Sequence, residues 1–338
     1  MNTVSPRTLT SFAVAAAGGG QFIFNLPNDY SIVRLGLRVS GAITIGTANA
    51  TALQAGGCAN VIRNVRLVPK GEIRHDLRGY EMKIVNQLFN EDSIVAAEPA
   101  LGQAANDFEC IVYRDFFMPR LIQAFADRGQ LPAHLIRDVQ VVVDIGLPED
   151  VVVKDTGTTA VFTGVTIEPF IVQAVPSVTA PAYFVNEKMT AIRDTEDMTA
   201  TGRKRIKLPT GNVFRGIILV TKTVTTGTVN DVVAFDDTLI DDVRLLSNNT
   251  EIIGSAGTNY RALKGDNRAG CFLTGEIAGV VFLDFGRGFS PAEMLDTTPE
   301  VWGNSDLQLE IDVSSVGAGA ELSILTLELT KPLTSPAQ

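Results

Sequence analysis

Hydrophobic and polar residues alternate in short segments along most of this chain. One clear case runs from Val139 to Ile145, where every second residue is aliphatic and Gln140 and Asp144 lie on the opposite face. A period of two predicts a β-strand with one face in a core and the other in solvent or a polar contact. Clusters of Thr, Gly, Asn and Asp separate such segments. This rhythm predicts a β-sandwich or barrel rather than alternating strands and helices.

The same pattern, followed along the chain, predicts strands in two successive sets. In the first half we expect strands at residues 21–26, 32–40, 42–46, 61–68, 108–117, 139–145 and 160–169. In the second half we expect them at residues 205–208, 213–221, 232–235, 242–246, 277–285, 307–313 and 321–329.

Each half also has a short helix signal just after a strand that ends in Asp-Phe. Pro119–Asp127 has proline near its first position and Gly129 beyond its end. Ser290–Leu295 starts with serine as an N-cap, followed by proline and an acidic first turn. A third helix is predicted over Tyr80–Phe89 from the spacing of its apolar residues.

The two halves repeat each other in order, which indicates a duplicated domain. Alternating strands resemble one another, so coincidence is the alternative for any single match. The order of the matches and the mostly falling offset, from 182 to 160 residues, favour duplication with loops of different length. The matched segments are Leu26-Pro27 with Leu208-Pro209, Arg34 with Arg215, Asn64–Leu67 with Asp242–Leu245, Asp115-Phe116 with Asp284-Phe285, Asp138–Asp144 with Asp306–Asp312, and Val165–Glu168 with Leu325–Glu328.

These signals predict an all-β chain of two tandem eight-stranded jelly rolls (β-sandwiches), each with a short helix inserted. The length of 338 residues also suits two domains better than one. The expected boundaries are an N-terminal arm at 1–20, a first jelly roll at 21–175, a Pro-containing linker at 176–182, a second jelly roll at 183–332 and a C-terminal tail at 333–338.

Composition narrows the function. Hydrophobic residues make up 45% of the chain and charged residues 20%, which is typical of a well-packed globular protein. The net charge of −10 disfavours direct nucleic acid binding. Cys58, Cys110 and Cys271 form no CxxC pair, so we expect maturation in a reducing compartment. The uncharged runs Thr8–Asn28 and Val39–Ile62 are diluted by polar residues, and neither predicts a transmembrane helix or signal peptide.

Candidate catalytic chemistry is sparse. His75 and His134 are the only histidines, too few for a cupin-type metal site and a poor basis for a Ser–His–Asp triad. We expect both to be ordinary surface or loop residues. No catalytic, cofactor-binding or metal-binding residue is therefore assigned, no cofactor is expected, and the chain is predicted not to be an enzyme.

The acidic clusters and one basic run could each bind a ligand or simply face solvent. Asp236, Asp237, Asp241 and Asp242, and separately Asp194, Glu196 and Asp197, offer hard oxygen ligands for calcium, although a solvated acidic loop explains them better. The basic run Arg203–Lys207 suits anionic lipid or nucleic acid, or a solvent-facing edge strand blunted by charge. The matching segment of the first half, Gln21–Asn25, is uncharged, so the run is not part of the shared fold.

Tandem jelly rolls joined by a short linker, with these repeated segments, resemble the double jelly-roll major capsid proteins of tailless icosahedral, membrane-containing bacteriophages (the tectivirus- and corticovirus-like lineage). Four pairs of segments carry the resemblance. They are the Leu-Pro turns at Pro27 and Pro209, the strands after them that contain Arg34 and Arg215, the segments Asn64–Leu67 and Asp242–Leu245, and the strands Asp138–Asp144 and Asp306–Asp312. The resemblance covers residues 20 to 330.

The resemblance implies a virion structural protein whose homotrimers form pseudo-hexagonal capsomers of an icosahedral shell. It implies other copies of the chain, penton and minor capsid proteins as partners, and an internal membrane as a contact of the N-terminal arm. Synthesis in the host cytoplasm follows. The alternative is a β-sandwich spike or fibre protein that binds a receptor or carbohydrate; one Trp and five Tyr offer few rings to stack on sugars.

Overall fold

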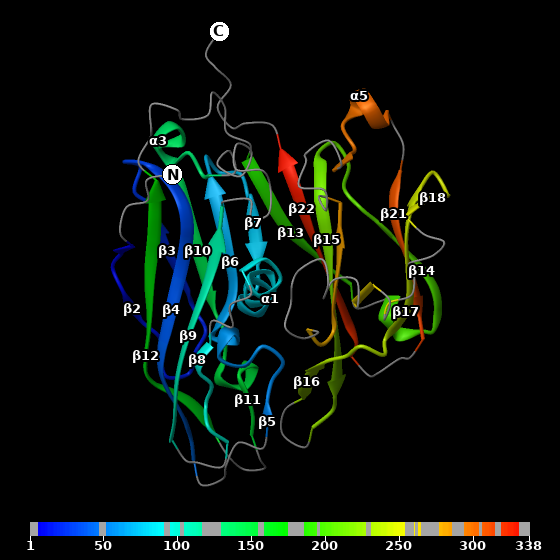
Figure 1. Cartoon of the computed structure of the whole chain (residues 1–338). Coiled ribbons are helices and arrows are strands. Elements are labelled where there is room, and N and C mark those ends of the chain that lie inside the picture. Colours follow the sequence, from blue (N-terminus) through cyan, green and yellow to red (C-terminus); the bar gives the residue numbers. More distant parts are fainter. Residues whose placement is uncertain are drawn as a thin grey trace. The chain divides into compact units, whose positions relative to one another are not determined.

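The chain forms two compact units in a computed structural model (Figure 1). The first unit contains residues 1–187, 227–232 and 331–338, and the second contains residues 188–226 and 233–330. The structure describes residues 6–46, 52–90, 95–101, 105–116, 130–154, 159–174, 186–194, 197–227, 231–253, 260, 263–264, 277–285, 294–303, 306–314 and 319–330.

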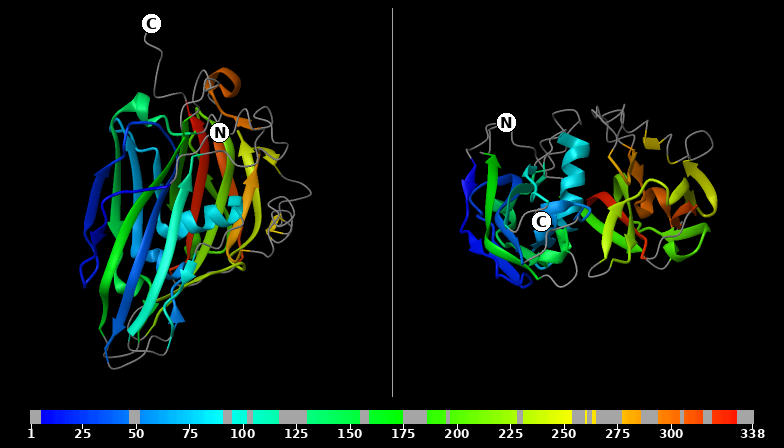
Figure 2. Two further views of the ribbon diagram at one scale, coloured as in Figure 1. Left: turned by 60° about the vertical axis from the view of Figure 1, so that its left-hand side comes forward. Right: turned by 90° about the horizontal axis from the view of Figure 1, so that it is seen from below.

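The first unit is a sandwich of two antiparallel sheets, seen end-on in Figure 2. One sheet has the order β12-β4-β9-β8, with β1 and β2 beside β12; the other has the order β7-β6-β10-β3. Their bounds are β1 Arg7–Thr8, β2 Phe12–Ala13, β3 Gln21–Asn25, β4 Ser31–Ile45, β6 Ile62–Pro69, β7 His75–Leu77, β8 Val95–Ala97, β9 Ala105–Asp115, β10 Val139–Ile145 and β12 Ala160–Ala174.

Short elements complete this unit. The helix α1 (Gly79–Asn90) packs against β9 and β6 and confirms the helix predicted over Tyr80–Phe89. The others are the small ladder of β5 (Ala52–Leu53) with β11 (Val152–Val153), the 3-10 turns η1 (Gly57–Val61) and η3 (Pro148–Asp150), and α3 (Ala133–Ile136).

The second unit has the same plan. One sheet has the order β14-β21-β17-β18, and the other centres on β15, which pairs with β22 on one side and with β16, β19 and β20 on the other. β13 lies beside β22. Their bounds are β13 Asn186–Asp194, β14 Gly202–Lys207, β15 Val213–Thr225, β16 Val232–Phe235, β17 Ile240–Ser247, β18 Thr250–Ile253, β19 Val280–Asp284, β20 Leu295–Asp296, β21 Leu307–Val313 and β22 Glu321–Thr330, with η4 at Asp197–Thr199 and α5 at Pro299–Trp302.

Strand register is shared by the two units, which is stronger evidence of duplication than the sequence matches. In the first unit Val141 lies opposite Leu67 on one side and Phe24 on the other. In the second, Leu309 lies opposite Leu245 and Ile206. These are the partners that the sequence offsets require. Because a slip of one residue would exchange the buried and exposed faces, agreement on both sides of the strand is a demanding test.

The turns agree as well. The first unit turns through Lys70 and Gly71, and the second through Asn248 and Asn249, all with positive φ. Two successive residues in the left-handed region form the type I′ turn that suits a twisted hairpin, and Gly and Asn accept this conformation most readily.

Two sequence matches are wrong in detail. Arg34 lies opposite Asp115, whereas the equivalent Asp284 lies opposite Gly216, so Arg215 is one residue out of register with Arg34. Leu325 lies opposite Ile218 and is therefore equivalent to Phe170 rather than to Val165. A bulge in β12 between Thr163 and Thr166 shifts the register there, which sequence offsets do not reveal.

The predicted strands all fall on observed strands, and β10, β16 and β21 match to the residue. The two segments predicted at 32–40 and 42–46 form one strand, β4. The predicted helix Pro119–Asp127 and the linker 176–182 lie outside the described residues. Of the helix predicted over Ser290–Leu295 only its last two residues are described, and Leu295 begins strand β20 instead.

Each core lies between two sheets and follows from the alternation. In the second unit the inward residues of β14, β15, β17, β21 and β22 share one cluster, including Ile206, Leu219, Leu245, Leu309 and Ile324. In the first unit Leu37, Leu67 and Val141 are similarly inaccessible. The outward positions of the same strands are therefore free to diverge, and the chemistry of the surface lies there.

Candidate functional site

The basic run forms the edge strand β14 of the second unit. Arg203, Arg205 and Lys207 are exposed, whereas Ile206 points into the core. Among the described strands, β14 pairs with β21 alone, so it lies at the edge of this sheet. This placement confirms the interpretation as a solvent-facing edge strand, on which charge discourages pairing with another strand.

Carboxylates on the neighbouring strands balance the run. Arg205 contacts Glu310 at 2.8 Å, and Lys207 contacts Asp306 at 2.9 Å. Arg244 of β17 adds a second, longer contact to Glu310 at 3.5 Å. Arg244 and Glu310 also border a shallow depression, together with Arg203, Asp242 and Asp312. Because Arg205, Lys207 and Arg244 each contact a carboxylate, these cations are poorly placed to bind phosphate groups.

In the first unit, the edge strand equivalent to β14 is β3, and it carries uncharged instead of charged residues. Ile23 and Val142 occupy the positions that Arg205 and Glu310 occupy in the second unit, since Ile23 pairs with Val142 as Arg205 pairs with Glu310. An apolar pair thus replaces an ion pair at matching positions. Ile23 is 55% exposed, so the side chain at the edge faces outward in both units.

The predicted acidic cluster does not form a common loop. Asp241 and Asp242 belong to strand β17, and Asp242 lies 3.9 Å from Arg244. Of the second acidic group, Asp194 ends β13, Asp197 begins η4, and Glu196 is outside the described residues.

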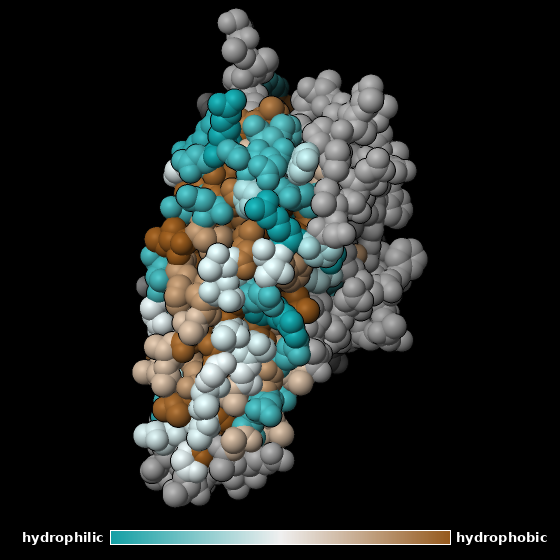
Figure 3. Space-filling model, turned by 90° about the vertical axis from the view of Figure 1, so that its left-hand side faces the viewer, coloured by the Kyte–Doolittle hydropathy of each residue, from teal (hydrophilic) through white to brown (hydrophobic). Residues whose placement is uncertain are grey.

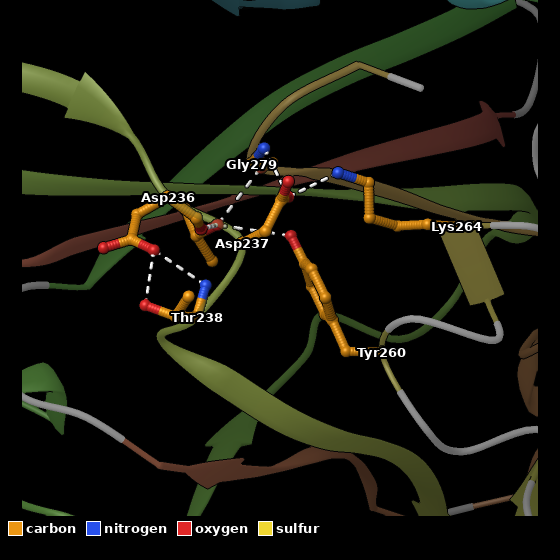
Figure 4. Close-up of polar contacts among 7 residues, drawn as sticks. Asp236, Asp237, Thr238, Tyr260, Lys264 and Gly279 are labelled. Carbon is orange, nitrogen blue, oxygen red and sulfur yellow. Dashed lines mark hydrogen bonds and ion pairs between the residues drawn. The ribbon is translucent and has the colours of Figure 1, made fainter. Parts of the chain in front are cut away.

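Asp236 and Asp237 instead take part in a polar clasp (Figure 4). The Asp237 carboxylate accepts a hydrogen bond from the Gly279 amide at 2.7 Å and forms an ion pair with the buried Lys264. Asp236 turns the other way and accepts hydrogen bonds from the amide and hydroxyl of Thr238, both at 2.7 Å.

The clasp connects segments that are far apart in sequence. The Thr221 hydroxyl of β15 donates to the Asp236 carbonyl and lies 3.2 Å from the Tyr260 hydroxyl. Burial raises the pKa of Tyr260, which keeps the hydroxyl protonated. No sequence motif connects Tyr260 or Lys264 with the aspartates, because only folding brings these residues together. One oxygen of each carboxylate is held by these donors, which gives the clasp a structural role.

Within the described part of the chain, no group of three or more His, Cys, Asp or Glu side chains is arranged to hold a metal ion.

The histidines lie in different elements. His75 is buried in β7 with its ring edge-on to Phe116, at 5.4 Å between centroids, so the expectation of a surface residue is wrong for it. Its neighbour on the sheet, Leu67, is a core residue, and that location decides its burial. His134 is half-buried in α3, and its Nδ1 lies 3.3 Å from the Ser31 hydroxyl.

Two cysteines lie together as free thiols. Cys58 of η1 and Cys110 of β9 are buried, and the two thiols share a hydrogen bond. That contact, together with burial, raises the pKa of Cys58. Cys271 is outside the described residues.

The N-terminal segment is part of the first unit. Arg7–Thr8 and Phe12–Ala13 pair with β12, and Phe12 stacks on Phe22 of β3 at 4.0 Å. The described residues of the segment expected to be an N-terminal arm are therefore held against the first sandwich. Backbone pairing supplies the order, which the Ala- and Gly-rich composition of this segment does not predict.

None of the helices in the described residues is both long and apolar enough to cross a lipid bilayer.

Sequence comparison gives no relative: no protein-family model matches the chain, and no curated protein matches it. Structural comparison finds proteins with a similar fold. The STIV (Sulfolobus turreted icosahedral virus) MCP superposes with a TM-score of 0.72 at 15% identity, over 97% of this chain and 96% of that one. The major capsid protein P2 of bacteriophage PM2 has a TM-score of 0.63 at 14% identity, over 98% and 99%.

A third similar structure comes from the PBCV-1 virus capsid, with a TM-score of 0.60 at 10% identity, over 99% of this chain and 97% of that one. The similarity in all three spans both units and nearly the full length of both proteins. At this level of identity it is a likeness of fold. The chain has the double jelly-roll fold of these viral major capsid proteins.

Proposed function

We propose that the chain is the major capsid protein of an icosahedral virus and that it acts as a homotrimer. The observation that carries the proposal is the full-length match to the STIV MCP, over 97% of this chain, together with the matches to PM2 P2 and the PBCV-1 capsid. A match over the whole chain supports a shared architectural role better than a match over one sandwich, which serves many functions.

The duplicated register explains what such a trimer achieves. Each chain contributes two units of one fold with the same strand pairing, so three chains present six similar units. A threefold oligomer of this kind fills a sixfold position in a closed lattice. Burial of apolar surface between chains drives the assembly, and no chemical step is required.

The remaining roles follow from this proposal. Its partners are further copies of the chain, then penton and minor capsid proteins, and an internal viral membrane where one is present. Its place is the virion after synthesis in the host cytoplasm, and it is not an enzyme. The balanced charges around Arg205 support the absence of direct nucleic acid binding.

The test is the assembly state of the purified full-length chain. We expect a particle of three times the 36.2 kDa chain mass by light scattering and mass photometry, and tiles with a hexagonal outline by negative-stain microscopy. A chain that stays monomeric at all concentrations and binds glycans on an array would overturn the proposal in favour of a spike or fibre protein.

A further inference from the structure

One side of the first unit carries an uncharged surface. It is formed by β2, β3 and the segment between them, residues 12–25, and we call it the arm–edge surface. No charged residue occurs from Thr8 to Asn28. Its exposed residues are small or apolar apart from two amides: Ala13, Ala15, Ala16, Ala17, Gly20, Gln21, Ile23 and Asn25. Figure 3 shows this side of the molecule, where apolar and neutral residues predominate over its middle and lower part.

The surface is built by contacts within the unit. Phe12 comes from the segment beside β12 and stacks on Phe22 of β3, so the segment reaches from the edge of one sheet to the edge of the other. The amide of Gly19 donates to the Gly146 carbonyl at 3.0 Å, and the Gly20 carbonyl accepts from Ile145 at 3.0 Å. The surface is therefore formed before any partner arrives, which lowers the entropic cost of binding.

Strand β3 also presents a free edge. It ends its sheet, and among the described strands it pairs with β10 alone. Leu26 donates to Val139 and Gly20 accepts from Ile145, so the even-numbered residues bond to β10. In an antiparallel ladder the backbone groups of Gln21, Ile23 and Asn25 then point away from the sheet. An unprotected edge of this kind is a template for contact with another chain.

The second unit shows what the same edge looks like when it is protected. Its equivalent strand β14 carries Arg203, Lys204, Arg205 and Lys207. Because the two edges share one fold and one register, the fold does not explain their difference in charge. Charge of this kind is typical of an edge that stays in solvent, and its absence is typical of an edge that a partner covers.

We infer that the arm–edge surface is a contact between copies of this chain. The inference rests on the proposed self-assembly, and charge favours this occupant. Each copy carries a net charge of −10, so two copies approach with least repulsion through surface that has no charge. A lipid surface fits less well, because attraction to anionic headgroups needs Lys or Arg, and residues 8–28 contain neither.

The experiment places the charge of the second unit on the first. Ile23→Arg reproduces Arg205, and the double variant Ile23→Arg/Val142→Glu reproduces the ion pair of Arg205 and Glu310. We expect the double variant to fold, because the second unit already has an Arg–Glu pair in the same register. The matched control is Val301→Arg, because Val301 is an aliphatic residue of the second unit that is 67% exposed.

Oligomer formation is measured by mass photometry over a dilution series, with circular dichroism to check folding. We expect both Ile23 variants to fold and to need roughly tenfold or more protein to form the oligomer, as for loss of an interface anchor. Val301→Arg assembles like the parent chain. If the parent is oligomeric and both folded Ile23 variants assemble equally well, the inference is wrong and the proposed function is unaffected.

A monomeric parent would overturn the inference and the proposed function together. Co-flotation with phosphatidylcholine vesicles tests whether the arm–edge surface binds lipid instead of a second copy of the chain. Binding of the parent that is lost in the Ile23 variants, with assembly unchanged, would assign the surface to lipid and overturn the inference.

Discussion

The Arg205 guanidinium lies 2.8 Å from the Glu310 carboxylate, at the two positions where the first unit has an isoleucine and a valine. Glu310 is only 7% exposed, whereas Arg205 is 50% exposed. A nearly buried carboxylate depends on its cations, since a charge without a partner is costly to desolvate. The same fold thus accommodates the Arg205–Glu310 ion pair in one unit and the apolar Ile23–Val142 pair in the other.

Arg205→Ile should destabilise the second unit by about 1–2 kcal/mol, because the nearly buried Glu310 carboxylate loses its closer cation. Arg205→Ile/Glu310→Val, which copies the first unit, should recover most of this loss. Urea denaturation of the parent, both single variants and the double variant gives the coupling free energy. Additive effects of the two single substitutions would show that the pair contributes nothing.

Phe12→Ala should loosen the N-terminal segment, because the ring stacked on Phe22 is lost. We expect a cost of about 1 kcal/mol that is confined to this segment. Hydrogen exchange of residues 7–20 measures it, with protection of β10 unchanged. Ala15→Ser, at an exposed position of the same segment, is the control. Equal exchange in Phe12→Ala and the parent would contradict the role given to the stack.

Gly36→Ala should destabilise the first unit by about 1–3 kcal/mol, because a Cβ at Gly36 would overlap the Phe170 ring on the neighbouring strand. Gly46→Ala is the matched control, since a Cβ there meets only atoms of Thr159 at 3.9 Å. Thermal unfolding compares the two. Equal melting temperatures would mean that the ring moves aside without cost.

Cys58 should resist alkylation in the native protein. Its raised pKa leaves little thiolate at neutral pH, and burial restricts access. Mass spectrometry of peptides after iodoacetamide treatment should show modification of Cys58 only when the chain is unfolded first. Rapid labelling of the native chain would show that the thiol is accessible and ionised.

His134 should make the first unit less stable in acid. Burial lowers its pKa from 6.5, so the unfolded chain binds a proton more readily than the folded one. This contribution is complete above pH of about 6.5 and is lost as the pH falls through the lowered pKa. His134→Asn should flatten the dependence of the melting temperature on pH in that range. An unchanged dependence would assign the acid sensitivity to other groups.

Much of this fold follows from local sequence. Alternation placed every predicted strand, because burial of one face imposes a period of two whatever the partner strand is. The sequence offsets of the repeat also pair Gln21–Asn25 with Arg203–Lys207, and the strand register confirms that pairing. The charge difference between the two edges is thus visible in the sequence.

Tertiary structure decided the rest. The Arg34 and Arg215 match fails by one residue, since β15 has a bulge between Phe214 and Gly216 that inserts a residue opposite β22. The order of the N-terminal segment comes from backbone bonds to β12 and from the Phe12 stack, which are contacts with distant residues. The clasp of Asp237 and Lys264 likewise exists only once the chain has folded. Sequence determined which residues face inward, because that depends on local period; the structure decided what the outward residues meet, because that depends on long-range pairing.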